Sequence, residues 1–376
     1  VDCYQQSLVL LKQCREHEQA ARTLMKLGLT HHSALDFRQA RRAYEEGFAL
    51  WQQAMQRQKA SPPSPLAAPH ALRVDWHEPR TLDPTMAWDL YSSCVIDQLF
   101  SGLVEFSPEM GVTPDVAASW EVLEGGCKYV FHLRDDVRWS DGTAVTAEDF
   151  AYAWRRVLNP AVNSANASLL YDIAGARAFH QAEDPEPDAL GIRAPDPVTL
   201  EVELERPTGY FPYLLAHHVS FPIPRHAFET GGDAWGSAGT IITNGPYRLE
   251  SWQPGQALIL ARNDDYHGER TGNVLHVELS LVTECATQLR SYEAGELDIF
   301  DLGSLPLPER DSVRHKHAGE DVSAPSLGTM YAGFDVSRPP FDDREVRRAL
   351  IFATEREYLA GVVMEGYYFP ATGGLI

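Results

Sequence analysis

The sequence predicts a mixed α/β fold preceded by an all-α segment, and two observations lead to this expectation. Residues 1–58 are helical in period and carry no strand signal, whereas strand-like and helix-like periods alternate from Leu72 onward. Between these regions, residues 59–71 contain KASPPSPLAAP, a Pro/Ala/Ser linker that is extended and semi-rigid. The length of 376 residues suits two or three domains. We therefore expect helical repeats in 1–58, a linker in 59–71 and the α/β region in 72–376.

The helical segment has the residue spacing of a tetratricopeptide repeat. Small residues let two antiparallel helices approach each other, while Leu and Tyr fill the space between them. The matching positions are Leu24, Leu27, Gly28, His31, Ala40, Tyr44 and Gly47. DFRQARRAYEEGFAL has an earlier partial echo in YQQSLVLL, in which Tyr4 and Ser7 lie about 40 residues before Tyr44 and Gly47. This longer period resembles the helical repeats of large bacterial transcription regulators. In that case the chain opens on the second helix of a truncated repeat. A simple helical hairpin is the alternative.

The stretch Tyr129–Leu158 specifies a strand, a turn and a helix. YVFHL alternates large apolar residues with others, as a strand does, and SDG supplies a tight turn whose glycine takes positive φ. Thr146 is placed to begin the helix, with acidic residues at the positive end of its dipole. We therefore interpret Asp141 as a turn residue and Asp149 as a helix-dipole partner, and not as an acid/base pair.

The remaining elements follow from the same periodicities. Strands are expected at ALRVDW, Val198–Leu204, Tyr247–Trp252, Ala257–Ala261 and Val274–Val282. Helices are expected within Leu90–Phe106, where the helix runs into a strand, and at Pro207–Leu215, Ala286–Ala294 and Asp343–Glu357. In the last helix, Val346, Ala349, Leu350 and Ala353 should face inward.

Several motifs together resemble one known family. HLRDDVRWSDGTAVTAEDFAYAWRRVLNP is similar to the signature of the family 5 extracellular solute-binding proteins, the oligopeptide- and dipeptide-binding proteins of ABC importers. TLDPTMAWDLYSSCVIDQLFSGLVEF and PDVAASWEVLEGG precede it at the spacing of that family. ELERPTGYFPYLL, TNGPYRLESW, AGELDI and PPFDDREVRRALIFATERE follow in the family's order. The resemblance covers about Leu72 to Ile376.

The resemblance implies a multi-lobe fold of the type II periplasmic-binding-protein kind. Carried onto this chain, lobe I spans about 72–100 and 225–325, lobe II about 101–224, and lobe III begins at 326. In the family the third lobe continues much further, so we expect that 326–376 is incomplete and that the chain is C-terminally truncated. A half-lobe leaves sheet edges and apolar helix faces unpaired. Ligands of such proteins bind in a cleft between lobes, and closure excludes water.

Composition excludes several classes of function. The formal net charge of −21 argues against nucleic acid as a partner, because phosphate binding needs clustered Lys and Arg. The five cysteines are scattered and form no C-x-x-C, which favours reduced thiols over disulfides or a zinc site. The sequence contains no run of about 18 apolar residues, so no membrane span is predicted. The N-terminus lacks the pattern of a signal peptide and an initiator methionine, so we interpret the chain as a fragment.

No catalytic signature is present, and we predict a protein that is not an enzyme and needs no cofactor. G-x-S-x-G, a Walker loop and H-E-x-x-H are all missing. The pairs His31-His32, His217-His218 and His315/His317 suggest metal binding, but adjacent histidines point in different directions and each pair needs outside ligands. We therefore predict no metal site.

The resemblance also implies ligand-contacting loops. The first follows Leu82-Asp83-Pro84 and carries Trp88, Asp89 and Leu90. The second matches Asn166, the third Asp301, Leu302 and Gly303, and a strand at Tyr331–Gly333 supplies Tyr331. The oligopeptide binders have acidic residues at the places of Trp88 and Gly333, so two charged contacts are missing here. The alternative for Trp88 is an ordinary core residue.

These observations predict non-catalytic binding of a peptide-like or other small solute. The helical repeats favour the sensor domain of a larger cytoplasmic bacterial regulator, in which cleft closure biases an effector domain. The first alternative is the peptide-binding component of an ABC importer. Such a component lies outside the cytoplasmic membrane and delivers its ligand to a permease. The second alternative is a protein-interaction scaffold with a degenerate ligand site.

Overall fold

The computed structural model describes residues 2–13, 17–33, 36–58, 71–107, 111–182, 186, 189–232, 235, 239–269, 272–322, 328–364 and 367–371. Two compact units make up the chain: Ala68–Ser304, and Val1–Ala67 together with Leu305–Ile376. The predicted linker sequence KASPPSPLAAP lies outside the described residues. The boundaries of the three lobes stay a prediction, and residues 305–325, which the sequence assigns to lobe I, fall in the unit that contains Leu305–Ile376.

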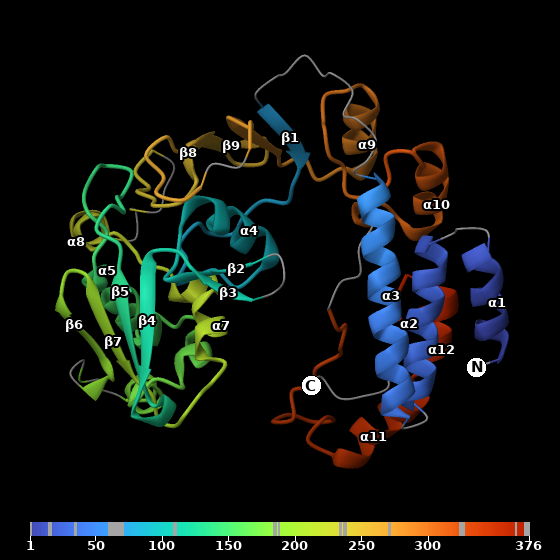
Figure 1. Ribbon diagram of the computed structural model, residues 1–376, viewed down its shortest axis with the longest axis horizontal. Coiled ribbons are helices and arrows are strands. Elements are labelled where there is room, and N and C mark those ends of the chain that lie inside the picture. Colours follow the sequence, from blue (N-terminus) through green and yellow to red (C-terminus); the bar gives the residue numbers. More distant parts are fainter. Residues whose placement is uncertain are drawn as a thin grey trace. The chain divides into compact units, whose positions relative to one another are not determined.

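The N-terminal segment forms the predicted helices. Helices α1 (Asp2–Gln13), α2 (His17–Ser33) and α3 (Phe37–Gln58) run side by side (Figure 1). Gly28 lies so close to the Tyr44 ring that an added Cβ would come within 2.5 Å of a ring carbon. Gly47 likewise lies against the Leu24 side chain. The small residues at the repeat-like positions therefore let α2 and α3 approach closely, as the spacing predicts.

The rest of this unit carries short helices. They are α10 (Leu307–Lys316), α11 (Arg344–Ala353), α12 (Arg356–Tyr358) and a π-helical turn at Leu359–Val363. The prediction of a helix to Glu357 is wrong, because Thr354 and Glu355 have extended ψ angles of 104° and 90°. The prediction that one face of this helix points inward is also wrong. Ala349, Leu350 and Ala353 are exposed, and α11 has no buried residue.

The unit Ala68–Ser304 contains two four-stranded sheets. The first consists of β1 (Ala71–Asp75), β8 (Tyr247–Gln253), β9 (Ala257–Arg262) and β10 (His276–Ser280) in the order β1-β10-β9-β8. Strand β1 is parallel to β10, and the other pairs are antiparallel. Helix α4 (Leu90–Leu99) follows β1, α8 (Arg225–Gly231) precedes β8, and α9 (Cys285–Glu293) follows β10. The four strands, α4 and α9 agree with the predicted elements, whereas α8 was not predicted.

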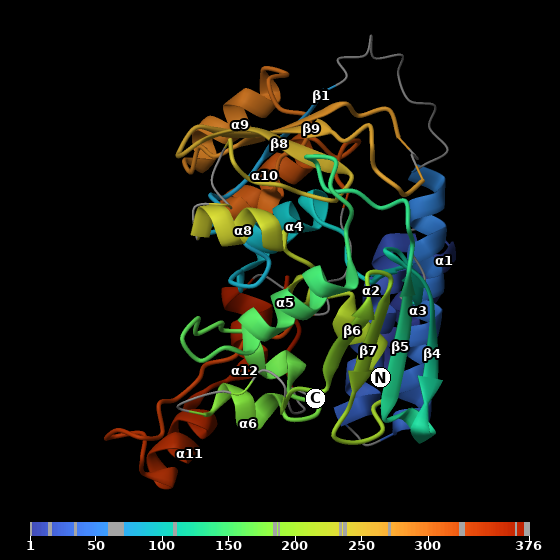
Figure 2. The same ribbon diagram turned by 90° about the vertical axis from the view of Figure 1, so that its left-hand side faces the viewer.

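The second sheet is antiparallel and has the order β4-β5-β7-β6. Its strands are β4 (Ala117–Leu123), β5 (Lys128–Leu133), β6 (Ile192–Asp196) and β7 (Thr199–Glu203). Helix α5 (Ala147–Leu158) packs beside β6 and β7 (Figure 2). The smaller elements are the hairpin of β2 (Val104–Phe106) and β3 (Val112–Pro114), α6 (Ala176–His180) and α7 (Phe211–Leu215). The helix predicted from Pro207 therefore begins later, at Phe211, with Pro212 in its first turn.

A single hydrophobic core supports both sheets of this unit. Trp139 and Trp154 are fully buried in it, whereas Trp120 and Trp252 are only partly buried. The Trp154 indole N–H donates to the carbonyl oxygen of Ser220 at 2.7 Å. A buried indole thus has its polar atom satisfied, which a large aromatic residue in a core requires. Among the described helices, none has the length and apolar character needed to cross a bilayer.

Candidate functional site

The loop between β1 and α4 is held at Asp83 and Thr85 by an ion pair and hydrogen bonds. The Asp83 carboxylate accepts from the backbone N–H and hydroxyl of Thr85 at 2.9 and 2.7 Å. It also forms an ion pair with Arg156 of α5 at 3.1 Å, and both side chains are only about a tenth exposed. The hydroxyl of Ser164 donates to the Thr85 carbonyl. This charged, largely buried anchor explains why the LDP motif holds the loop in one position.

The next residues of the loop are held through the carbonyl oxygen of Ala87. It accepts from Asn166 Nδ2 at 2.7 Å, and it lies 3.0 Å from His218 Nε2. Asn166, predicted as a ligand contact of a second loop, therefore lies against the first loop, and its contact with ligand stays a prediction. Its amide nitrogen is engaged by the protein backbone, so its shown role is to position the loop.

The anchored part of the loop is followed by Trp88 and Asp89, and α4 begins at Leu90. Trp88 is 58% exposed and Leu90 67% exposed, so the alternative of Trp88 as a core residue is wrong. The Arg80 guanidinium lies 4.9 Å from the centroid of the Trp88 ring. Asp89 caps α4, and its carboxylate accepts from the backbone N–H and hydroxyl of Ser92. The loop thus presents an aromatic face and a cation to solvent.

The third predicted loop contacts the end of β1, where the Tyr91 ring also packs. The backbone N–H of Asp301 donates to the carboxylate of Asp75, at the end of β1, at 2.9 Å. Burial raises the pKa of Tyr91, and the negative charges of Asp301, Asp75 and Asp89 raise it further. Two segments that are over 200 residues apart in sequence therefore both lie against the end of β1, where Asp301 bonds Asp75 and the Tyr91 ring packs beside His77.

The Asp75 carboxylate at the end of β1 is buried. Burial raises the pKa of Asp75, against the opposing effect of the hydrogen bond from Asp301. The His77 ring packs 4.3 Å from the Tyr91 ring. The sequence analysis missed Asp75, His77, Arg80 and Tyr91. Their signal was available, because Asp75 and His77 stand where β1 ends and Tyr91 follows directly on the predicted loop.

The other predicted residues are placed as follows. The Asp301 carboxylate accepts from the backbone N–H of Gly303 at 2.8 Å, and Leu302 lies in the same short 3₁₀ turn. Tyr331 is 73% exposed and belongs to the unit that contains Leu305–Ile376. Its membership of the site stays a prediction.

The histidine pair 217–218 contacts the backbone of the protein, through Ala87 and Val219. The two rings lie 4.1 Å apart at 33°, so the expectation that adjacent histidines point apart is wrong for this pair. Burial and the neighbouring His218 lower the pKa of His217 to about 4, and burial lowers the pKa of His218. Both rings are neutral at pH 7. The described residues contain no group of three or more metal-ligating side chains.

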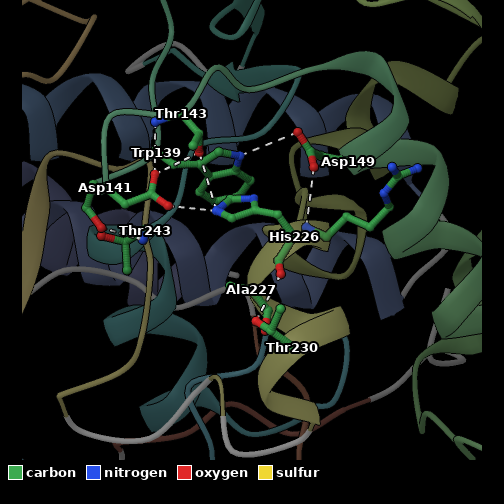
Figure 3. Close-up of polar contacts among 10 residues, drawn as sticks. Trp139, Asp141, Thr143, Asp149, His226, Ala227, Thr230 and Thr243 are labelled. Atoms are coloured by element: carbon green, nitrogen blue, oxygen red, sulfur yellow. Dashed lines mark hydrogen bonds and ion pairs between the residues drawn. The ribbon is translucent and has the colours of Figure 1, made fainter.

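A second polar cluster lies at the turn formed by Ser140-Asp141-Gly142 (Figure 3). His226 Nε2 lies 2.7 Å from the Asp141 carboxylate and 3.4 Å from the Thr143 hydroxyl. Burial opposes ionisation of Asp141, but hydrogen bonds from Thr143 and His226 hold its pKa below the usual value. Acid and hydroxyl meet the same ring nitrogen, so this cluster does not have the geometry of a nucleophilic triad, which uses both nitrogens. It ties the turn to α8.

A cavity of about 580 Å³ adjoins this cluster in the same unit. Its described lining consists of His226, Ala227, Thr230, Gly231, Trp235, Thr240 and Ile242. The loop residues predicted to contact ligand are not in that lining.

Residues 111–376 match the sequence pattern of the bacterial extracellular solute-binding proteins, family 5 Middle. The chain belongs to this family. The probable deoxycholate-binding periplasmic protein YgiS of Escherichia coli is 34% identical over 312 residues, covering 82% of this chain and 57% of that protein. The periplasmic oligopeptide-binding protein OppA of E. coli is 33% identical over 304 residues, covering 80% and 55%. The chain thus spans a little over half the length of these curated relatives.

Solved structures give the same result. The crystal structure of Haemophilus influenzae OppA in complex with RPPGFSPFR superposes with a TM-score of 0.73 at 29% identity, covering 78% of this chain and 57% of that one. The murein tripeptide binding protein MppA of E. coli gives 0.72 at 31% identity, covering 78% and 57%. The α/β fold predicted for the chain therefore matches that of oligopeptide-binding proteins. Family 5 solute-binding proteins are non-enzymatic, which agrees with the prediction that the chain is not an enzyme.

Proposed function

We propose that the protein binds a small solute, peptide or amphiphile, without transforming it, as the substrate-binding component of an ABC importer. The observation that carries the proposal is that the Asp301–Gly303 loop and Tyr91, which follows the Trp88–Leu90 loop, both contact the end of β1. Ligand sites of this kind need convergent polar groups beside apolar surface. Relatives named as periplasmic binding proteins support a place outside the cytoplasmic membrane and a permease as partner.

The proposed contacts are Trp88, Asp89, Leu90, Asp301, Leu302 and Gly303, with Asn166 and His218 holding the first loop in place. A ligand contact of Tyr331, which belongs to the other unit, is a separate proposal from the sequence. The exposed aromatic and aliphatic side chains supply apolar contact area. The backbone of the two loops supplies hydrogen-bonding groups, as extended peptides require. The large cavity beside His226 is not the proposed site, because neither loop lines it.

A second candidate function is the ligand sensor of a larger regulator. Helices α1–α3 precede the residues that match the family, and their close glycine contacts suit a tetratricopeptide-like repeat that binds another protein or domain. The names of the relatives favour the importer. A permease subunit captured by the protein supports the importer, whereas capture of a transcription-regulator domain supports the sensor.

Native mass spectrometry tests the binding function. The protein is produced from its complete reading frame and sprayed before and after incubation with oligopeptides and with deoxycholate. We expect a one-to-one complex with at least one probe or with a solute retained through purification, and recovery of that solute unchanged. Absence of any complex, or chemical conversion of the bound solute, would contradict the proposal.

A further inference from the structure

The Arg80–Trp88 pair is the most distinctive feature of the proposed site. The guanidinium lies 4.9 Å from the centre of an indole that is itself 58% exposed, and Arg80 is exposed too. A cation over an aromatic ring gains about 0.5–1 kcal/mol at an exposed position, which orients the guanidinium without burying it. The pair therefore presents a flat apolar surface and a positive charge side by side.

The backbone under the pair is fixed from both ends. Ser92 Oγ accepts from the backbone N–H of Arg80 at 2.9 Å and donates to the Asp89 carboxylate at 2.8 Å. Arg80 and Trp88 thus stand on a loop closed by the first turn of α4. The main chain of Arg80 is held by this hydrogen bond, and its guanidinium is oriented by the contact with the Trp88 ring.

Nearby carboxylates are engaged elsewhere. Asp89 accepts two hydrogen bonds from Ser92, and Asp75 accepts from the backbone of Asp301. Asp301 itself accepts from Gly303. Within the described part of the chain, no carboxylate forms an ion pair with Arg80, whose recorded side-chain contact is the Trp88 ring. Its five N–H donors therefore face solvent beside the indole.

We propose that Arg80 and Trp88 form a subsite that selects a carboxylate attached to an apolar body. A planar guanidinium binds a carboxylate in a two-pronged manner, and the indole covers the adjoining apolar surface. This inference rests on the proposed function and specifies the class of solute. The carboxylate comes either from the C-terminus of an apolar peptide or from an amphiphilic acid, and the probes below separate these sources.

The test compares each acid with its uncharged counterpart by isothermal titration of the protein from its complete reading frame. Deoxycholate is paired with its methyl ester, and trileucine with trileucine amide. A charge-assisted hydrogen bond contributes about 1.5–3 kcal/mol, so we expect the preferred acid to bind at least about tenfold more tightly than its counterpart. The acid that shows this ratio identifies the source of the carboxylate.

Variants then assign the preference to this pair. Arg80→Gln and Trp88→Glu should abolish the acid-over-ester or acid-over-amide ratio, while Arg80→Lys should keep part of it. Arg193→Gln, which removes an exposed arginine of β6, is the matched control and should leave the ratio unchanged. A merely structural role would lower affinity for both members of a pair and leave their ratio intact.

Two results would overturn the inference, and they differ. If an acid and its counterpart bind equally, or if Arg80→Gln retains the ratio, the subsite is wrong while the binding function stands. If no peptide, amphiphile or retained solute binds at all, the proposed function fails and the inference fails with it.

Discussion

Acidification should loosen the loop that carries Trp88, because it depends on two neutral histidines. His218 contacts the Ala87 carbonyl, and the His217 ring packs on the His218 ring. The backbone N–H of Val219 donates to His217 Nδ1, which is an unprotonated nitrogen. Protonation of His217 removes that acceptor and places a charge in a buried position beside a second imidazole.

The size of the effect follows from the pKa of His217. It falls from 6.5 to about 4 in the folded protein, so the unfolded chain takes up a proton at a higher pH than the folded chain does. Stability is therefore lost as the pH falls from 6.5 to 4. The full loss is roughly 3 kcal/mol, of which about 2 kcal/mol has occurred by pH 5.

The assay is urea denaturation at pH 7.5 and pH 5.0, followed by tryptophan fluorescence. His217→Asn keeps an acceptor for the Val219 N–H and cannot protonate. We expect this variant to lose about 2 kcal/mol less than the parent protein between the two pH values. His132→Asn, at an exposed position of β5, should behave as the parent does. If His217→Asn shows the full pH dependence of the parent, the argument from burial is refuted.

Two further predictions concern the framework. Asn244 is buried and exchanges two 3.0 Å hydrogen bonds with the backbone of Ser101, so Asn244→Ala should lower the free energy of unfolding by about 2–4 kcal/mol in the same denaturation assay; a loss below 0.5 kcal/mol would show that the bonds do not matter. Gly28→Val should destabilise the α2–α3 pair by about 1–3 kcal/mol through a clash with Tyr44, measured by circular dichroism. Tyr44→Ala in the same chain should relieve that clash, and failure to do so would contradict the packing.

Local patterns predicted most of the strands and helices. Thr146 and Asp149 begin α5 as expected, and the structure adds that the Asp149 carboxylate accepts from the backbone N–H of Thr146. Such signals are local, since a cap and the helix it begins lie within a few residues. The exposure of the apolar face of α11 was not predicted, because an apolar face shows that a helix needs a partner and does not show that one is present.

Several residues of the proposed site were named through the family motifs, and their contact with a ligand stays a prediction. Trp88, Asp89 and Asn166 were named from the sequence, and the structure brings all three to one loop. What the sequence did not reveal is the part each residue plays. Asn166 binds a carbonyl of the protein, and Arg80 reaches the Trp88 ring. These are contacts between residues far apart or differently oriented, so their geometry follows from tertiary packing and not from spacing.

Hydrogen–deuterium exchange with and without bound solute tests the central claim most directly. The solute found by native mass spectrometry is added at a saturating concentration to the protein from its complete reading frame. We expect slower exchange in peptides covering residues 86–93 and 299–304, the two segments that contact the end of β1. Unchanged exchange in both segments, with protection confined to other residues, would contradict the assignment of the site to these loops.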